Sequence, residues 1–248
     1  MTVAQFLECW LKDYAWANLA PRTAEGYEYI IRRHVIPELG NTILTQLKPD
    51  HIQRYYSKKL NSGRYDGSGG LSSCSVRHHH MVLHRAFESA MNWGFLGRNP
   101  ADAVSPPRRQ KSEMRTWNED DIQRFLNIAR DKPYYALFYL ALFTGMRRSE
   151  LLALRWCDVD FVLSQVSVTR TVHHVKNRGL IFRQPKTEKG RRTIALSPSA
   201  TLMLKEHRNE QVAGRILLGE PLADDDLVFS QLDGKLLLPN TITHAWLN

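Results

Sequence analysis

Cysteine is scarce in this sequence, which has only Cys9, Cys74 and Cys157 among its 248 residues. The three are far apart, odd in number and never part of a CxxC pair, so neither a disulfide scaffold nor a zinc ribbon is indicated. We therefore expect three buried thiols in a reducing compartment, the cytoplasm.

Long apolar runs are lacking as well. No run of apolar residues approaches the roughly 18 that a membrane span requires. The first residues, Met1 to Gln5, also lack the basic-then-apolar pattern of a signal peptide. These absences predict a cytoplasmic protein with no membrane partner.

Acidic residues are too few to balance the basic ones. The chain has 34 Lys and Arg against 25 Asp and Glu, which gives a formal net charge of +9, and both halves are basic. Such a surface suits a protein that closes around a polyanion such as nucleic acid. Charge alone leaves open a basic protein without such a partner.

Helical periodicity dominates residues 1–98, for which we predict a helical domain. Apolar side chains recur at helical spacing over Val3–Tyr14. Pro37 should end the second helix, because proline has no N–H to donate. A long helix is predicted over about Ser73–Trp93. Its buried stripe should consist of Val76, Leu83, Phe87 and Ala90.

Prolines and basic residues cluster in the next segment, 99–115, which we interpret as an extended interdomain linker. A second domain, 116–248, should open with a capping box of Thr116 and Glu119. The nearly all-apolar helix Tyr134–Phe143 should be buried.

The apolar period then changes from helical to two around Val166–Val172. We predict a return strand over Leu180–Arg183 and a third strand over Arg192–Leu196. A helix should follow over Ala200–Val212. The predicted fold class is mainly α with a small antiparallel β-sheet, the sheet lying in an α+β second domain.

One stretch has residues suited to binding an anion. Gly145 should end the buried helix in a left-handed cap, which places Arg147 in the first turn of the next helix. A cation is unfavourable there, and Glu150 can offset part of that cost. An arginine held in such a place is a candidate for gripping an anion, and a surface Arg–Glu pair is the alternative.

The surrounding string TGMRRSELLALRWCDVD resembles the box TGxRxSELLxLxWxDID of the tyrosine recombinase (phage integrase) family. Pro185–Leu196, PKTEKGRRTIAL, resembles its lysine hairpin, with Gly190 where the family often has serine. LAPRTAEGYEYIIRRHVIPELG and SVRHHHMVLHRAFESAMNWGFLGRNPA resemble its core-binding domain. The resemblance implies a helical SAM-like core-binding domain over 1–98 and part of a catalytic domain over 116–248.

The resemblance also implies site-specific recombination through a 3′-phosphotyrosyl intermediate, without a metal or other cofactor. Arg147 would be the first phosphate-binding arginine, Lys186 the general acid, and Glu150 the residue that orients the arginine. The family's second arginine and its nucleophilic tyrosine should follow the lysine hairpin. The last tyrosine here is Tyr139, and no His-x-x-Arg box follows Lys186. We therefore expect a chain cut within its catalytic domain, which binds DNA but has no nucleophile to cleave it.

Double-stranded DNA is the expected partner, with self-association into a tetramer on recombining DNA for the full-length protein. The histidines around His80 and His84 could also suggest a metal site, but we favour a helix face toward DNA and no metal. The expected DNA-binding residues lie on the long helix, in the linker and in the hairpin: Arg77, His80, His84, Arg108, Arg109, Lys111, Arg191 and Arg192.

Two other functions remain open at this stage. One is a non-catalytic DNA-binding module from a decayed or truncated integrase. The other is a helical interaction protein with a basic surface, whose DNA affinity would be weak and nearly independent of salt.

Overall fold

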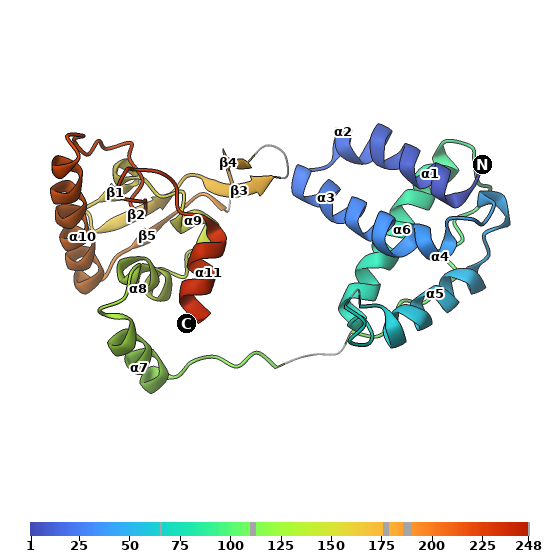
Figure 1. Ribbon diagram of the computed structural model, residues 1–248, viewed down its shortest axis with the longest axis horizontal. Coiled ribbons are helices and arrows are strands. Elements are labelled where there is room, and N and C mark those ends of the chain that lie inside the picture. Colours follow the sequence, from blue (N-terminus) through green and yellow to red (C-terminus); the bar gives the residue numbers. More distant parts are fainter. Residues whose placement is uncertain (65, 110–112, 176–178, 186–189, 248) are drawn as a thin grey trace. The chain divides into compact units, whose positions relative to one another are not determined.

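The computed structural model describes residues 1–64, 66–109, 113–175, 179–185 and 190–247. The chain divides into two compact units, Met1–Met114 and Arg115–Asn248 (Figure 1). Helices predominate, and the strands form small antiparallel sheets in the second unit. The predicted fold class is confirmed.

The first unit is helical throughout. Thr2 and Gln5 form the capping box with which its first helix begins. Two π-helical turns, η1 and η2, join shorter helices into longer continuous ones. The elements in chain order are α1 Val3–Trp10, η1 Leu11–Ala15, α2 Trp16–Asn18, α3 Pro21–Ile30, η2 Ile31–Val35, α4 Ile36–Leu39, the 3-10 turn η3 Leu44–Gln46, α5 Pro49–Ser62 and α6 Ser73–Asn92.

The prediction that Pro37 ends a helix is wrong. Helical backbone continues through Pro37 to Leu39, because the wider turn Ile31–Val35 precedes it. The N–H of Ile36 donates to the carbonyl of Ile31, five residues back. Pro37 then stands in the first turn of α4, where a missing N–H costs little.

Helix α6 contributes the predicted stripe to the core of this unit. Val76, Leu83, Phe87 and Ala90 are all buried, which confirms that stripe. They belong to a single cluster of buried apolar residues with α1, α3 and α5 (Figure 1). Its largest members are Trp10, Tyr56, Phe6 and Phe87.

Part of the predicted linker packs within this unit. Ala101 and Val104 are buried in its core. Asn99 is also buried, and its side-chain amide donates to the carbonyl of His84 at 3.0 Å. Residues 99–104 are therefore held against α6.

The second unit combines helices with two antiparallel sheets. One sheet has the order β1-β2-β5, and the other pairs β3 with β4. The stretch Val166–Val172 thus contributes to two different strands. The elements are α7 Glu119–Ala129, α8 Tyr135–Thr144, α9 Arg148–Leu151, the 3-10 turn η4 Trp156–Asp158, β1 Val159–Asp160, β2 Gln165–Val168, β3 Thr171–Val175, β4 Gly179–Arg183, β5 Arg192–Ala195, α10 Pro198–Leu217 and α11 Pro239–Leu247.

The capping box predicted for the first helix of this unit is displaced by two residues. Asn118, not Thr116, is the N-cap of α7, and its side chain accepts from the N–H of Asp121 at 2.8 Å. The carboxylate of Asp121 accepts the N–H of Asn118 in return. Asparagine caps helices better than threonine, which accounts for the shift.

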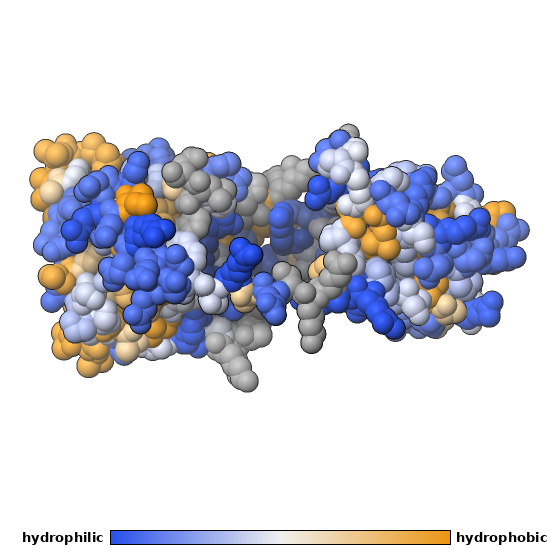
Figure 2. Space-filling model, turned by 90° about the horizontal axis from the view of Figure 1, so that it is seen from below, coloured by the Kyte–Doolittle hydropathy of each residue, from blue (hydrophilic) through white to orange (hydrophobic). Residues whose placement is uncertain are grey.

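Helix α8 is only partly enclosed. Leu137, Phe138 and Leu140 are buried as predicted, but Phe143 is 49% exposed. Further apolar side chains are exposed on α10, and Figure 2 shows hydrophobic residues gathered at the left-hand end of the view, where that helix lies. Among the described residues, no helix is both long and apolar enough to cross a membrane.

The expectation of buried thiols is wrong, since Cys9, Cys74 and Cys157 are all exposed. Two of them stand beside a surface carboxylate. The thiol of Cys9 donates to Asp13 at 3.0 Å, and that of Cys157 to Asp225 at 3.4 Å. Their positions face solvent, so polar partners replace the apolar packing that cysteine usually finds.

Candidate functional site

The turn between α8 and α9 sets the position of Arg147. Gly145 ends α8 with φ of 62°, so the predicted left-handed cap is confirmed. Arg147 itself has φ of −70° and ψ of 149°, an extended conformation. It therefore precedes α9 as its N-cap residue, and does not lie inside the first turn as predicted.

The carboxylate of Glu150 accepts hydrogen bonds from both the side chain and the backbone of Arg147. One carboxylate oxygen, Oε1, accepts Nη1 of Arg147 at 2.8 Å, and Oε2 accepts the backbone N–H of Arg147 at 2.9 Å. Glu150 is 2% exposed, while the side chain of Arg147 is 72% exposed. The turn thus exposes the guanidinium of Arg147 to solvent, while the buried Glu150 holds it in place.

Arg192, on β5, makes a second ion pair with the same carboxylate. Its Nη2 lies 2.8 Å from Oε2 of Glu150, and its Nη1 lies 3.2 Å from Oε1. Arg192 is one of the residues that the sequence led us to expect in contact with DNA. No local pattern signals the pairing, because the two residues are 42 positions apart and meet only in the folded unit.

Two opposing effects act on the carboxyl of Glu150. Burial by itself would raise its pKa, but the hydrogen bonds from Arg192 and Arg147 outweigh burial and hold the pKa below its ordinary value. The carboxylate is therefore charged at neutral pH. With two guanidinium groups around one carboxylate, the cluster has a net positive charge.

Lys186, the remaining residue of the predicted catalytic set, lies outside the described residues. Arg191 is exposed and donates to the side chain of Gln184. The neighbouring Arg148 donates to the carbonyl of Pro239, at 3.0 Å, and to Thr243, which ties α9 to α11.

The residues predicted to contact DNA from α6 all have partners within the first unit. Arg77 donates to the carbonyl of Pro107 at 3.2 Å, and His84 lies 2.9 Å from Asp102. Nδ1 of His80 is 2.9 Å from the hydroxyl of Tyr56.

The basic residues of the linker and the histidines of α6 lie in different surroundings. Arg108 and Arg109 are exposed, and Lys111 lies outside the described residues. His79 is buried against the hydroxyl of Tyr55, at 2.8 Å. The described part of the chain contains no group of three or more His, Cys, Asp or Glu side chains placed to hold a metal ion.

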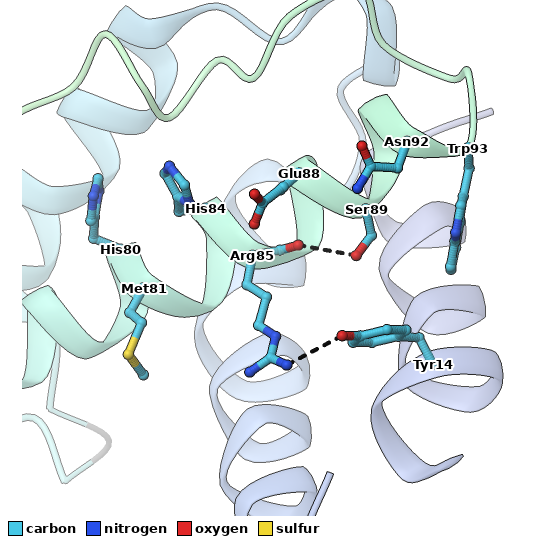
Figure 3. Close-up of a pocket in the computed structure, with 9 residues that line it drawn as sticks. All are labelled: Tyr14, His80, Met81, His84, Arg85, Glu88, Ser89, Asn92 and Trp93. Atoms are coloured by element: carbon cyan, nitrogen blue, oxygen red, sulfur yellow. Dashed lines mark hydrogen bonds between the residues drawn. The ribbon is translucent and has the colours of Figure 1, made fainter. Parts of the chain in front are cut away.

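A shallow pocket of about 660 Å³ lies along α6. Figure 3 shows Arg85 reaching the phenol of Tyr14, whose hydroxyl it contacts at 3.2 Å. Met81 and Trp93 line the pocket and are 47% and 41% exposed. Glu88 lines it as well, so its surface combines both charges with apolar side chains.

The fold defines a class of protein with a small helical unit followed by an α+β unit that presents an arginine on a carboxylate base. The phage integrase family model matches residues 115–248, and the model for the phage integrase N-terminal SAM-like domain matches residues 2–60. The chain belongs to the phage integrase family, whose members are tyrosine recombinases.

Individual relatives agree with this assignment. The chain is 28% identical over 240 residues to a tyrosine recombinase XerC-like protein of Caldanaerobacter subterraneus, covering 91% of this chain and 60% of the relative. It is 29% identical to an integrase of Streptomyces ambofaciens, covering 99% of this chain and 62% of that protein. The chain thus spans about three fifths of the length of these curated relatives.

The fold also matches solved integrase structures. The Tn1549 transposon integrase in complex with a circular intermediate DNA superposes with a TM-score of 0.78 at 20% identity, covering 96% of this chain and 73% of that one. A lambda integrase tetramer bound to a Holliday junction gives a TM-score of 0.67 at 17% identity, covering 100% of this chain and 65% of that one.

Proposed function

We propose that this chain carries the DNA-binding surfaces and the first phosphate-binding arginine of a site-specific tyrosine recombinase. The observation that carries the proposal is the exposed guanidinium of Arg147, fixed on the buried carboxylate of Glu150. Family membership supplies the reaction class, DNA strand cleavage and rejoining through a 3′-phosphotyrosyl link.

The geometry suits the first arginine of that reaction. When an oxygen nucleophile attacks a phosphodiester, negative charge builds on the non-bridging oxygens. A guanidinium is a planar fork that can donate two hydrogen bonds to such oxygens. Nη1 of Arg147 already donates to Glu150. The other N–H donors belong to an exposed guanidinium, which a phosphate can approach from solvent.

Lys186 is the proposed general acid, on the family resemblance alone. The exposed basic residues of the linker, Arg108 and Arg109, are proposed to bind the DNA backbone. The reaction needs no metal or nucleotide, since the energy of the cleaved bond is kept in the phosphotyrosyl link.

Double-stranded DNA is the proposed partner, with self-association on the recombining DNA. The Tn1549 and lambda integrases were solved on DNA, the latter as a tetramer on a Holliday junction, which supports this proposal. We further propose a cytoplasmic, nucleoid-associated protein of bacterial or phage origin, because the relatives named above are bacterial.

The test is DNA binding measured by fluorescence anisotropy over a range of salt concentrations. We expect a steep fall of affinity with salt, with a log–log slope of about 0.9 for each phosphate neutralised. Arg147→Gln should reduce that slope by about 0.9, because one phosphate contact is lost.

The matched control is Arg130→Gln, which removes an exposed charge that follows α7 and should leave the slope unchanged. Weak affinity that hardly depends on salt would contradict the proposal and favour a protein-interaction role.

A further inference from the structure

We propose that Arg192 is a positioning residue, which acts through Glu150 to hold the guanidinium of Arg147 in one orientation. The effect of this positioning on phosphate binding rests on the proposed function. The arrangement itself rests on the contacts of the three side chains, described above, and on their unequal exposure.

Four hydrogen bonds from the two arginines hold the carboxylate of Glu150. Oε1 of Glu150 accepts from Arg147 and Arg192 at 2.8 and 3.2 Å, and Oε2 accepts from the same two residues at 2.9 and 2.8 Å. A carboxylate has about four acceptor positions in its plane. All are occupied, so the carboxylate cannot rotate without breaking at least two charge-assisted bonds.

The two arginines of the cluster differ in their exposure to solvent. The side chain of Arg192 is 31% exposed, less than half the 72% of Arg147, and Glu150 beneath them is 2% exposed. Arg192 therefore lies on the inner side of the cluster and Arg147 on the outer side. The inner guanidinium holds the carboxylate, and the outer one remains open to a ligand.

Strand pairing anchors Arg192 in a sheet. β5 pairs with β2, and Arg192 lies opposite Val168, a buried residue. Its backbone is thus fixed by strand pairing, whereas α9 is a single turn of four residues. Through the ion pair between Arg192 and Glu150, the sheet restrains the turn that carries Arg147.

Arg191 provides a matched comparison. It has the same charge and precedes Arg192 directly, but it is exposed and donates to Gln184 instead of Glu150. A role in simple charge attraction predicts equal effects of Arg191→Gln and Arg192→Gln. A positioning role predicts that only the second change reaches Arg147.

The experiment follows the Nε–Hε NMR signal of Arg147 in the whole 248-residue chain, assigned with Arg147→Lys, while inorganic phosphate is titrated. In Arg192→Gln we expect the signal to move and phosphate binding at Arg147 to weaken on the order of tenfold, the loss of about one charge-assisted hydrogen bond. Arg191→Gln should leave both as in the wild type.

Arg192→Lys serves where the glutamine variant does not fold. Lysine keeps the charge but cannot bridge both oxygens, so the Arg147 signal should move in this variant as well. A merely structural role would lower the melting temperature without changing the Arg147 signal well below it.

An unchanged Arg147 signal in folded Arg192→Gln or Arg192→Lys overturns the proposal, as does an equal response to Arg191→Gln. A wild-type chain that binds neither phosphate nor DNA would instead contradict the proposed function. In that case the signal of Arg147 still decides whether Arg192 positions it.

Discussion

The carboxylate of Glu150 accepts both the backbone N–H and the guanidinium of Arg147, at 2.9 and 2.8 Å. One buried acidic residue thus fixes the backbone of the turn and the direction of its arginine together.

Glu150→Gln should destabilise the second unit strongly. The amide keeps the shape but loses both ion pairs, and its NH₂ group faces a guanidinium donor. Removing one partner of a buried ion pair costs about 3–5 kcal/mol, which urea unfolding would measure.

The control is Asp224→Asn, which breaks the exposed ion pair with Arg208. That change should cost less than about 1 kcal/mol. Equal losses in the two variants would show that Glu150 is no more than a surface partner.

Gly145→Ala should destabilise the chain by about 1–2 kcal/mol, the cost of a left-handed conformation for a residue with a Cβ. Nothing lies within 4 Å of the added carbon, so backbone strain alone is at issue. Thermal unfolding measures the effect.

Gly26→Ala gives the comparison of opposite sign. Gly26 lies within α3 with open space around it and no positive φ. Alanine there should stabilise the helix by about 0.5–1 kcal/mol. A neutral Gly145→Ala would mean that the cap does not need its left-handed backbone.

The first unit should lose stability in mild acid because of His79. Burial lowers the pKa of this imidazole from 6.5 to about 3, with His34, His78 and Lys59 acting in the same direction. Below pH 6.5 the unfolded chain binds a proton that the folded unit does not, so stability falls as the pH falls. Between pH 6.5 and pH 4.5 the loss from this group is about 2 kcal/mol.

Urea unfolding at several pH values measures this dependence. His79→Gln should make it less steep, whatever its effect on stability at neutral pH. Burial also lowers the pKa of His34 and of His80, so part of the dependence should remain. His78→Gln, an exposed neighbour, should retain the wild-type dependence. The explanation fails if both variants retain it.

Arg108 and Arg109 are proposed to bind DNA phosphates. The double variant Arg108→Gln/Arg109→Gln should reduce the log–log salt slope of DNA binding by about 1.8. The control Arg22→Gln/Arg32→Gln removes the same charge from side chains that are already paired with acidic residues. An equal reduction in the control would show a general charge effect and no specific contact.

Much of the fold followed from local pattern. The apolar stripe of α6 and the left-handed cap at Gly145 were predictable, because each depends on residues within a turn or two of one another. The N-cap of α7 and the continuation of helix through Pro37 were not, because nearby competing signals decided them.

The sequence by itself determined the family, the helical first unit and the presence of Arg147 and Glu150 in one short turn. Only the tertiary structure decided that Arg192 completes this cluster. It lies 42 positions from Glu150, and the folded unit brings the two together. The same distinction explains the thiols, since the exposure of Cys9 depends on which face of α1 its neighbours cover.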